Sequence, residues 1–577
     1  MGLFFLTTEP GGDEQQARVE AALAAGGFHA TWRHAQAGLR IVLCRKLNGG
    51  GGLTVRGEGD DFALATGSFI YQGQTGAAAL KAFLNAFTPG EDLWKGTHGI
   101  WSAVLRKSGV TYLVNDQLNS DKIYYDAGRR VFSNSFIALC EAGKAGSGGV
   151  DAQGSYEYVW NGAPFGTKTF LSAIRSLPNN TVATLDGTSA RLVPIAQTYR
   201  LAPMPGELHT EAVADACNAK LKSLFAIYSA KWPQGVRSAL SGGYDSRLLL
   251  GLLLSSGIQP TLFVYGNAEA GDVRVAKTIC TGEGLPIRHV DKQRQLPAPL
   301  DAFPGIMATN AIAFDGWKFD GLFDGGVDLA DRLSRARDGI PLMNGSVGEV
   351  YRNFFYLRDA AYSLRQLVHT FYSRYHPRAC TDRFRPAAYE NAITADIAEA
   401  IGAPGHGKLP RQAIEMAYPL FRGRYWTARD GAINQKFGTA LYPFLEPAVF
   451  DGTWNIPIAM KNFGRLEACM IARLTPRLAR YTSDYGFVFS AEPPWRYRAK
   501  MTINYWRPPG LRKFTYRLHH RRPQTKPYYL QQAYLRSVLD MDFPYMRRLF
   551  NVDWMHDAEA FNRLCTVEYL CQRYGVG

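Results

Sequence analysis

The residues Ser241-Gly-Gly-Tyr-Asp-Ser246 have the types and spacing of a site for a phosphate chain. The glycines allow a tight turn and a close approach of the backbone to a ligand. The N–H groups of such a turn, and of the helix behind it, point at an anion. Ser241 and Ser246 can add hydroxyl donors, whereas Asp245 would repel phosphate unless a magnesium ion lay between them. The set predicts a site for pyrophosphate and Mg²⁺; the plainer interpretation is a glycine turn with a serine cap.

Two kinds of element must position these residues. The turn follows a short apolar run, Val236–Leu240, and precedes Leu248–Leu254, which is apolar all round and therefore predicts a buried helix. From about residue 210, helical periods alternate with short apolar strands, which is typical of an α/β domain with a parallel sheet. Residues 1 to about 195 are instead rich in strand patterns separated by Gly, Asn and Asp turns. We therefore predict two domains, 1–200 and 207–577, with Pro203–Glu207 as the linker.

The strand, turn and helix resemble the ATP pyrophosphatase loop of asparagine synthetases, and the resemblance spans most of the chain. In the second half, similar motifs are Phe263-Val-Tyr265, Asp272–Ala276, Asn344-Gly-Ser-Val-Gly-Glu349 and Tyr442-Pro-Phe-Leu-Glu446. In the first half, the segments that fall where that family has its glutamine-hydrolysing motifs are Gly67–Tyr71, Asn115-Asp116, Tyr124-Tyr125, Phe132-Ser-Asn134, Thr169-Phe170, Ile174 and Leu177-Pro178.

The resemblance implies an α/β protein of two parts. The first is an Ntn-hydrolase-type αββα glutaminase-like domain, and the second is an adenine-nucleotide α-hydrolase-like (PP-loop) domain with a parallel sheet and a helical C-terminal part. It implies ATP and Mg²⁺ as cofactors. The ATP-binding residues that it implies are Leu240, Ser241, Gly242, Gly243, Asp245, Ser246, Val264 and Gly345. The implied metal ligands are Asp245 and Glu349, and the candidate catalytic residues are Asp245, Glu349 and Arg480.

Three departures from the family reduce the range of activities that the resemblance implies. Family glutaminases expose an N-terminal cysteine after loss of Met1, but residue 2 is Gly2 and the nearest cysteine is Cys44. Because a thiolate must attack the glutamine amide, we expect no glutaminase activity. The substrate strip Asn-Gly-Glu is also replaced, by Thr66-Gly-Ser68.

The second departure concerns a lysine that the family places shortly before a Gly-Phe pair. Gly486-Phe487 is preceded here by Thr482-Ser-Asp-Tyr485, without a lysine. Arg480, or Arg477 and Arg473 before it, is the candidate to bind the departing phosphate, because guanidinium binds phosphate in a bidentate manner. The alternative is that these arginines form a solvated surface.

The third departure is Ser346, which stands where the β-lactam-forming branch has a tyrosine. Without glutamine as nitrogen source, the simplest amine is one on the substrate itself. The chain is thus most similar in kind to lasso-peptide cyclases, which adenylate an Asp or Glu side chain of a ribosomal peptide and close a macrolactam. A peptide substrate, a precursor-processing protease and a leader-binding protein are the partners that this implies. A ligase using ammonia or a free amine, a β-lactam synthetase and a non-catalytic ATP-binding scaffold remain open.

Composition sets further limits. The chain has 577 residues, a formal net charge of +15 and eight scattered cysteines without a Cys-x-x-Cys pair, which favours a cytoplasmic protein with reduced thiols. No apolar run predicts a membrane span, and no signal peptide is expected. The basic excess is concentrated between Arg496 and Lys526 and is interleaved with aromatic residues. This region is either a solvated surface or a recruitment surface for the substrate peptide, since no motif supports nucleic-acid binding. Its cations Arg512, Lys513, Arg521 and Arg522 are the candidate peptide contacts.

Overall fold

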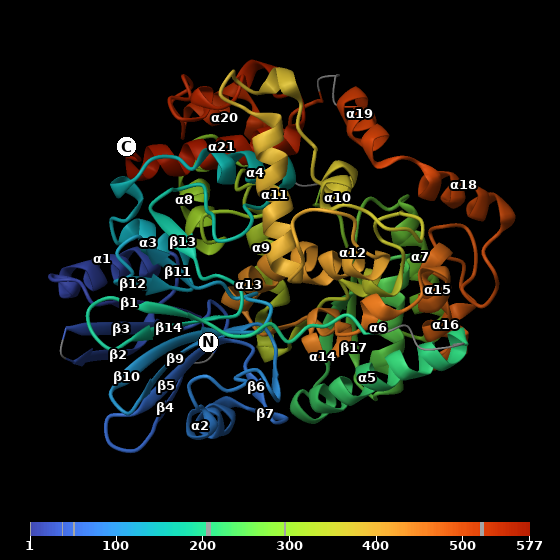
Figure 1. Cartoon of the computed structure of the whole chain (residues 1–577), viewed down its shortest axis with the longest axis horizontal. Helices are drawn as coiled ribbons and strands as arrows, with labels where there is room; N and C mark the ends of the chain where they lie inside the picture. Colours follow the sequence, from blue (N-terminus) through green and yellow to red (C-terminus); the bar gives the residue numbers. More distant parts are fainter. Residues whose placement is uncertain (1, 37, 50–51, 203–208, 293–295, 520–523) are drawn as a thin grey trace.

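The first part of the chain forms two antiparallel sheets of six strands each (Figure 1). The computed structural model describes residues 2–36, 38–49, 52–202, 209–292, 296–519 and 524–577. The first sheet has the order β13 (Ile174–Ser176), β11 (Tyr124–Asp126), β12 (Val131–Ser133), β1 (Leu3–Thr7), β3 (Leu39–Cys44) and β2 (Ala30–Gln36). The second has the order β15 (Arg191–Pro194), β14 (Thr181–Leu185), β10 (Val110–Asn115), β9 (Trp101–Lys107), β5 (Phe62–Gly67) and β4 (Leu53–Arg56).

The two sheets stack face to face, because alternate side chains along each strand point to opposite faces of its sheet. In β1, Phe4 and Leu6 lie in the core between the sheets, whereas Leu3 and Phe5 lie in the core beneath the helices. Helices α1 (Gly12–Ala25) and α3 (Phe136–Glu141) pack on the first sheet, and α2 (Gly76–Ala86) packs on the second. The layers therefore run helix, sheet, sheet, helix, and antiparallel sheets between helices were the expected arrangement.

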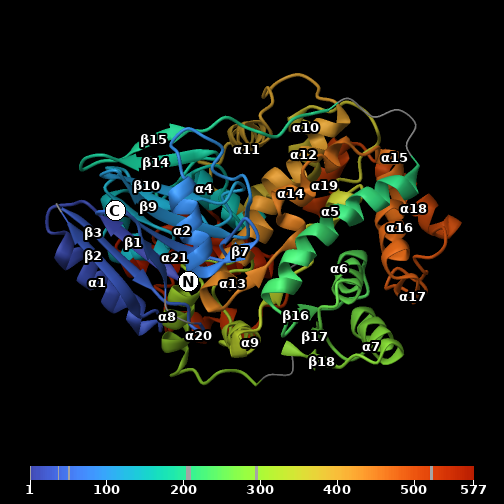
Figure 2. The same ribbon diagram turned by 90° about the horizontal axis from the view of Figure 1, so that it is seen from below.

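A parallel sheet of five strands lies in the second part, with the order β18 (Ile287–Val290), β17 (Pro260–Tyr265), β16 (Val236–Ala239), β19 (Leu342–Met343) and β20 (Ala440–Leu441). Figure 2 shows α5 (Thr210–Lys231), α6 (Tyr244–Ser255) and α7 (Gly271–Glu283) gathered around its strands. Successive strands extend from β16 to one side, and the chain then returns to add β19 and β20 on the other side. The strand order thus reverses at β16, and ligands bind at such a point in open parallel sheets. The predicted α/β class with a parallel sheet is confirmed.

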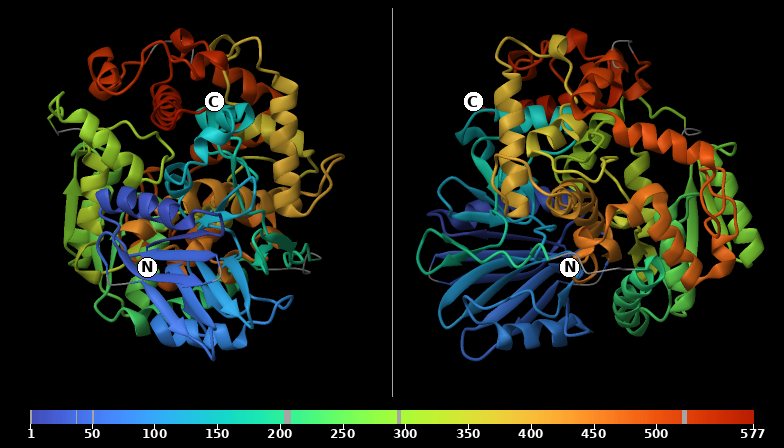
Figure 3. Two further views of the ribbon diagram at one scale, coloured as in Figure 1. Left: turned by 90° about the vertical axis from the view of Figure 1, so that its left-hand side faces the viewer. Right: turned by 45° about the vertical axis from the view of Figure 1, so that its right-hand side comes forward.

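Helices dominate the remainder of the chain, and the right-hand view of Figure 3 shows the blue antiparallel strands and the green parallel strands on opposite sides of the molecule. The last helix, α21 (Ala558–Tyr574), packs on α4 (Ala152–Asn161) of the first part (Figure 1). The predicted linker, Pro203–Glu207, lies outside the described residues. Among the described helices, none combines the length and the apolar character that a membrane span requires.

Candidate functional site

The Ser241–Ser246 turn lies between β16 and α6, as the sequence predicts. The Ser241 N–H donates to Ser246 Oγ at 3.0 Å, and the Gly243 N–H donates to Ser241 Oγ at 3.4 Å. The Gly242 N–H donates to Oδ1 of Asp272, from α7, at 2.8 Å. The amides of these three residues are therefore paired within the protein. The exposed Asp272 carboxylate holds the position at Gly242 that an anionic ligand would take.

The loop after β19, Asn344–Glu349, passes directly against Asp245. A Cβ at Gly348 would lie 2.7 Å from Asp245 Oδ1, so only glycine permits this approach. Val347 has φ 79°, a left-handed conformation that is unfavourable for a β-branched residue. The surrounding packing imposes this conformation, and the loop carries Glu349 to the side of Asp245.

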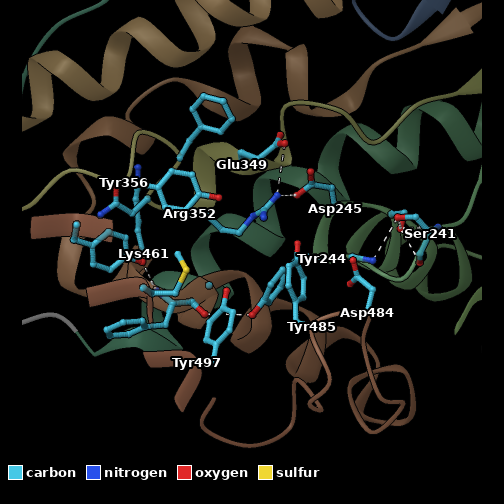
Figure 4. A pocket seen from close by; sticks show the side chains of 18 of the residues that line it. Ser241, Tyr244, Asp245, Glu349, Arg352, Tyr356, Lys461, Asp484, Tyr485 and Tyr497 are labelled. Carbon is cyan, nitrogen blue, oxygen red and sulfur yellow. Dashed lines mark hydrogen bonds and ion pairs between the residues drawn. The ribbon is translucent and has the colours of Figure 1, made fainter. Parts of the chain in front are cut away.

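A single guanidinium joins the carboxylates of this region (Figure 4). Arg352 Nη2 lies 2.8 Å from Asp245 Oδ1 and 3.7 Å from Glu349 Oε1, and its Nε lies 2.7 Å from Oε2 of Glu467 in α16 (Arg465–Leu474). The Tyr418 hydroxyl donates to Glu349 Oε2 at 2.6 Å. Two residues far apart in the sequence, Asp245 and Glu349, are thus brought together as predicted, with Arg352 between them.

The electrostatics of the cluster show a shortage of positive charge. Burial raises the pKa of Asp245; the Arg352 charge opposes the increase and the Glu349 charge adds to it. Burial, followed by the Asp245 charge, also raises the pKa of Glu467. Burial would raise the pKa of Glu349 as well, but the Arg352 charge and the Tyr418 hydroxyl hold this pKa below its ordinary value. One guanidinium does not offset one buried and two partly buried carboxylates, so a further cation would be stabilised here.

Asp245, Glu349 and Arg352 line a cavity of about 380 Å³. Its carboxylates are Asp245, Asp272, Glu349 and Asp484, and its cations are Arg352 and Lys461. A triphosphate alone would be repelled by this lining. Mg²⁺ is commonly held by one or two carboxylates together with substrate phosphates, so Asp245 and Glu349 fit a magnesium-bound nucleotide.

One helix closes the cavity on a side that the motifs do not indicate. Tyr497, Met501 and Tyr505 of α18 (Trp495–Trp506) are four residues apart and line the cavity together. From the sequence, the aromatic residues of this segment were predicted to form a solvated surface or a surface for the substrate peptide, and none was predicted to line the nucleotide cavity, although their spacing could have identified one face. Arg352, Tyr418 and Glu467 were also missed, because no local pattern links them to Asp245.

The other predicted ATP-binding residues lie behind the cavity. Val264 is buried in β17 and Leu240 is buried directly after β16, where the Leu240 N–H donates to Phe263 O. The backbone of Gly345 packs closely against the turn, since a Cβ at this position would lie 3.2 Å from Asp245 O.

The prediction for the catalytic arginine needs correction. Arg480 is exposed and is not among the described residues that line the cavity. Arg473 pairs with Asp215, and Arg477 lies 3.4 Å from Glu283. The structure therefore brings none of the three arginines to the cavity, and Arg352 and Lys461 are the cations that line it.

The basic segment also differs from expectation. Arg512, in α19 (Pro509–His519), donates to the carbonyls of Phe355 at 2.8 Å, Tyr356 at 2.5 Å and Asn504 at 2.9 Å. Lys513 pairs with Glu390. These two side chains anchor α19, so they are not free contacts for a peptide. Arg521 and Arg522 lie outside the described residues.

Exposed apolar side chains are the feature of this segment that faces outward. Trp495, Ile503 and Trp506 are 68%, 71% and 63% exposed. They lie on the side of α18 opposite the cavity, because their spacing of eight and three residues keeps them on one helical stripe.

The first part has no room for the missing nucleophile. A Cβ at Gly2 would lie 2.6 Å from backbone atoms of Arg45 and Cys44. Burial raises the pKa of the Cys44 thiol to about 12, so Cys44 is no substitute. Thr66, from the altered strip, donates its hydroxyl to the buried Asp121 at 2.8 Å.

No family model and no curated protein matches the chain. Among solved structures, one described as the allosteric regulatory enzyme of purine biosynthesis is 8% identical, with a TM-score of 0.24 over 50% of this chain and 80% of that one. Glutamine phosphoribosylpyrophosphate amidotransferase from B. subtilis, complexed with ADP and GMP, is 10% identical, with a TM-score of 0.24 over 60% of this chain and 82% of that one. Scores this low assign neither a family nor an activity.

Proposed function

We propose that this chain is an ATP-dependent ligase that activates a substrate carboxylate as its adenylate and then forms an amide bond. The observation that carries the proposal is the meeting of two loops at the reversal point of the parallel sheet. Ser241–Ser246 supplies amide and hydroxyl donors, and Asn344–Glu349 supplies the second carboxylate beside Asp245. The place and the donor set support the binding of a magnesium-bound triphosphate.

The residues that line the cavity have separate roles in this reaction. The turn binds the phosphates once Asp272 leaves Gly242, and Asp245 with Glu349 would hold Mg²⁺, which neutralises the charge of the leaving pyrophosphate when bound. Arg352 can then turn from the carboxylates to a phosphate oxygen. Tyr485, Tyr497 and Tyr505 keep water away from the reacting atoms.

The bond changes are those of adenylate chemistry. A carboxylate oxygen of the substrate attacks the α-phosphorus of ATP, and the bond to pyrophosphate breaks. The amine nitrogen then attacks the activated carbonyl carbon, AMP leaves, and the nitrogen loses a proton. Both steps take place in one cavity, so the amine has to be present before water reaches the adenylate.

The packed Gly2 favours an amine that belongs to the substrate. We therefore propose an acidic side chain of a ribosomal peptide as the acid and the peptide's own N-terminal amine as the nucleophile, giving a macrolactam. The exposed Trp495, Ile503 and Trp506 beside basic residues offer a surface for such a peptide. A processing protease and a leader-binding protein follow from this proposal, and both stay predictions.

The test is exchange of labelled pyrophosphate into ATP in the presence of candidate acids. Peptides whose N-terminal amine is acetylated should still support exchange, because adenylation does not need the amine. Only the free-amine peptide should yield a cyclic product that has lost one water. If a small acid or a sugar acid supports exchange and peptides do not, a ligase using a free amine replaces the macrolactam proposal. If no acid supports exchange and ATP still binds, the scaffold alternative stands.

A further inference from the structure

Two more cavities, of about 400 and 290 Å³, share one wall. Phe319, Arg422 and Trp426 line both. The first is also lined by Ser346, from the loop whose Glu349 lines the nucleotide cavity. A ligand in these cavities would lie next to the proposed adenylation site without occupying it.

Most cations of the larger cavity are already neutralised. Lys318 lies 3.1 Å from Asp320 and 3.3 Å from Asp324. Arg332 lies 3.0 Å from Asp328 and 2.8 Å from Asp430, and Arg429 lies 3.2 Å from Asp315. Because each has an aspartate partner, none of these three cations needs a ligand.

Arg422 differs from them. Its guanidinium is partly buried between two rings, 5.3 Å from the centre of Phe354 and 4.6 Å from that of Trp426. Within the part of the chain that the structure describes, no carboxylate forms an ion pair with it. Stacked rings leave the N–H edge of a guanidinium available, and that edge matches a carboxylate in a bidentate manner.

The element that carries Arg422 also reaches the nucleotide cavity. Residues Tyr418–Thr427 form a π-helix, a rare conformation that is frequently found at functional sites. Tyr418 of this π-helix donates to Glu349, and the Phe354 ring that stacks on Arg422 lines the nucleotide cavity. One short element thus connects Arg422 with the predicted metal ligands.

We propose that the paired cavities bind the acid-bearing substrate, with Arg422 holding a carboxylate and Trp426 and Phe319 packing on the adjoining chain. This inference rests on the proposed function, because it identifies the substrate as an acid that enters beside the nucleotide. Arg422 acts in the initial binding of the acid, and the carboxylate moves from it into the nucleotide cavity before any bond changes.

Binding without nucleotide tests the proposal separately from catalysis. Acetyl-Asp-NH2 is titrated into the full chain by ligand-observed NMR, with its uncharged analogue acetyl-Asn-NH2 and inorganic phosphate as comparison probes. We expect the acid to bind and the amide analogue to bind much more weakly. Arg422→Gln should lower the affinity for the acid roughly 10- to 100-fold. Arg422→Lys should recover part of the loss, because it keeps the charge but not the planar fork.

Arg378 provides a matched control, since its guanidinium also stacks on a tryptophan, Trp554 at 5.0 Å, away from both cavities. Arg378→Gln should bind the acid as the parent does, and ATP binding should be unchanged in Arg422→Gln. Equal binding of the acid and its amide analogue, unchanged binding in Arg422→Gln, or binding of phosphate alone would each overturn the proposal. If the acid binds through Arg422 but no pyrophosphate exchange occurs, the carboxylate site stands and the ligase proposal fails.

Discussion

Charge balance is the property that single residues set in the nucleotide cavity. Asp245, Glu349 and Glu467 surround Arg352, and Asp272 and Asp484 lie beside the glycine turn. Removing one partner from such a cluster is costly, because it leaves uncompensated charge. The cavity as a whole is negative, so positive charge has to accompany a nucleotide.

Asp272→Asn tests this balance directly. Asparagine can still accept the Gly242 N–H, but one negative charge is lost where the phosphates would bind. We expect ATP to bind about three- to tenfold more tightly when Mg²⁺ is limiting, since one repulsive pair is removed. Isothermal titration against Asp301→Asn, an exposed aspartate outside the cavity lining, measures the effect. Weaker binding in Asp272→Asn would show that Asp272 is needed as a ligand instead.

Local spacing explains which residues of the site could be predicted. Ser241, Gly242 and Asp245 lie within one turn, so their types and order indicate a phosphate site without further information. Glu349 was identified from a glycine-rich loop and a family resemblance. Arg352 and Glu467 were not identified, because their contacts with Asp245 cross more than one hundred residues and depend on how α6 and α16 pack.

At the scale of elements, α18 and α19 show how one basic segment serves several purposes. The inner side of α18 lines the cavity, its outer side is apolar and exposed, and the cations of α19 hold the pair in place. The sequence indicated the charge and the aromatic residues of this segment. It could not show which cations were already engaged, because their partners come from elsewhere in the chain.

Arg512→Ala should release α19 locally. Three carbonyls lose a charged donor, so the free energy of local opening of residues 495–515 should fall by about 2 kcal/mol. Their amide exchange should then become roughly 30-fold faster. Hydrogen-exchange mass spectrometry measures this, with Arg496→Ala as the control because Arg496 lies over the exposed Trp495. Identical exchange in both variants would mean that other contacts hold α19.

Short or unusual elements were the least predictable part of the fold. β19 and β20 have two residues each, too few for a period to be seen, yet they complete the parallel sheet and place the Glu349 loop. The π-helix Tyr418–Thr427 has no periodic signature that would separate it from an α-helix. By contrast, the strand–turn–helix around Ser241 combines an apolar strand, glycines and an apolar helix, and it was predicted correctly.

Across the whole molecule, the two parts are joined by buried polar contacts. Lys46 donates to Gln435 Oε1 at 3.1 Å and to Gly438 O at 2.7 Å. Gln435 in turn donates to Ser68 Oγ at 2.7 Å. The antiparallel sheets thus support α13 (Ala428–Phe437), which follows the π-helix, and this supports a structural role for the first part.

Glutamine hydrolysis should therefore be absent. Purified protein should release no glutamate from glutamine above the uncatalysed background, with or without ATP. Gly2→Cys should not restore the activity, because the new Cβ would lie 2.6 Å from the backbone of Arg45 and Cys44. A coupled glutamate dehydrogenase assay measures the release. Glutamate formation by the parent chain would refute the structural role of the first part.

The central claim is that the two loops at the reversal of the parallel sheet bind magnesium-bound ATP, and equilibrium binding tests it without knowledge of the substrate. Isothermal titration of ATP into the parent chain and into Asp245→Asn, each with Mg²⁺ and with EDTA, is the decisive measurement. We predict Mg²⁺-dependent binding by the parent and roughly 100-fold weaker binding by Asp245→Asn, with far-ultraviolet circular dichroism unchanged. Equal affinity of both proteins, or binding that is indifferent to Mg²⁺, would contradict the account.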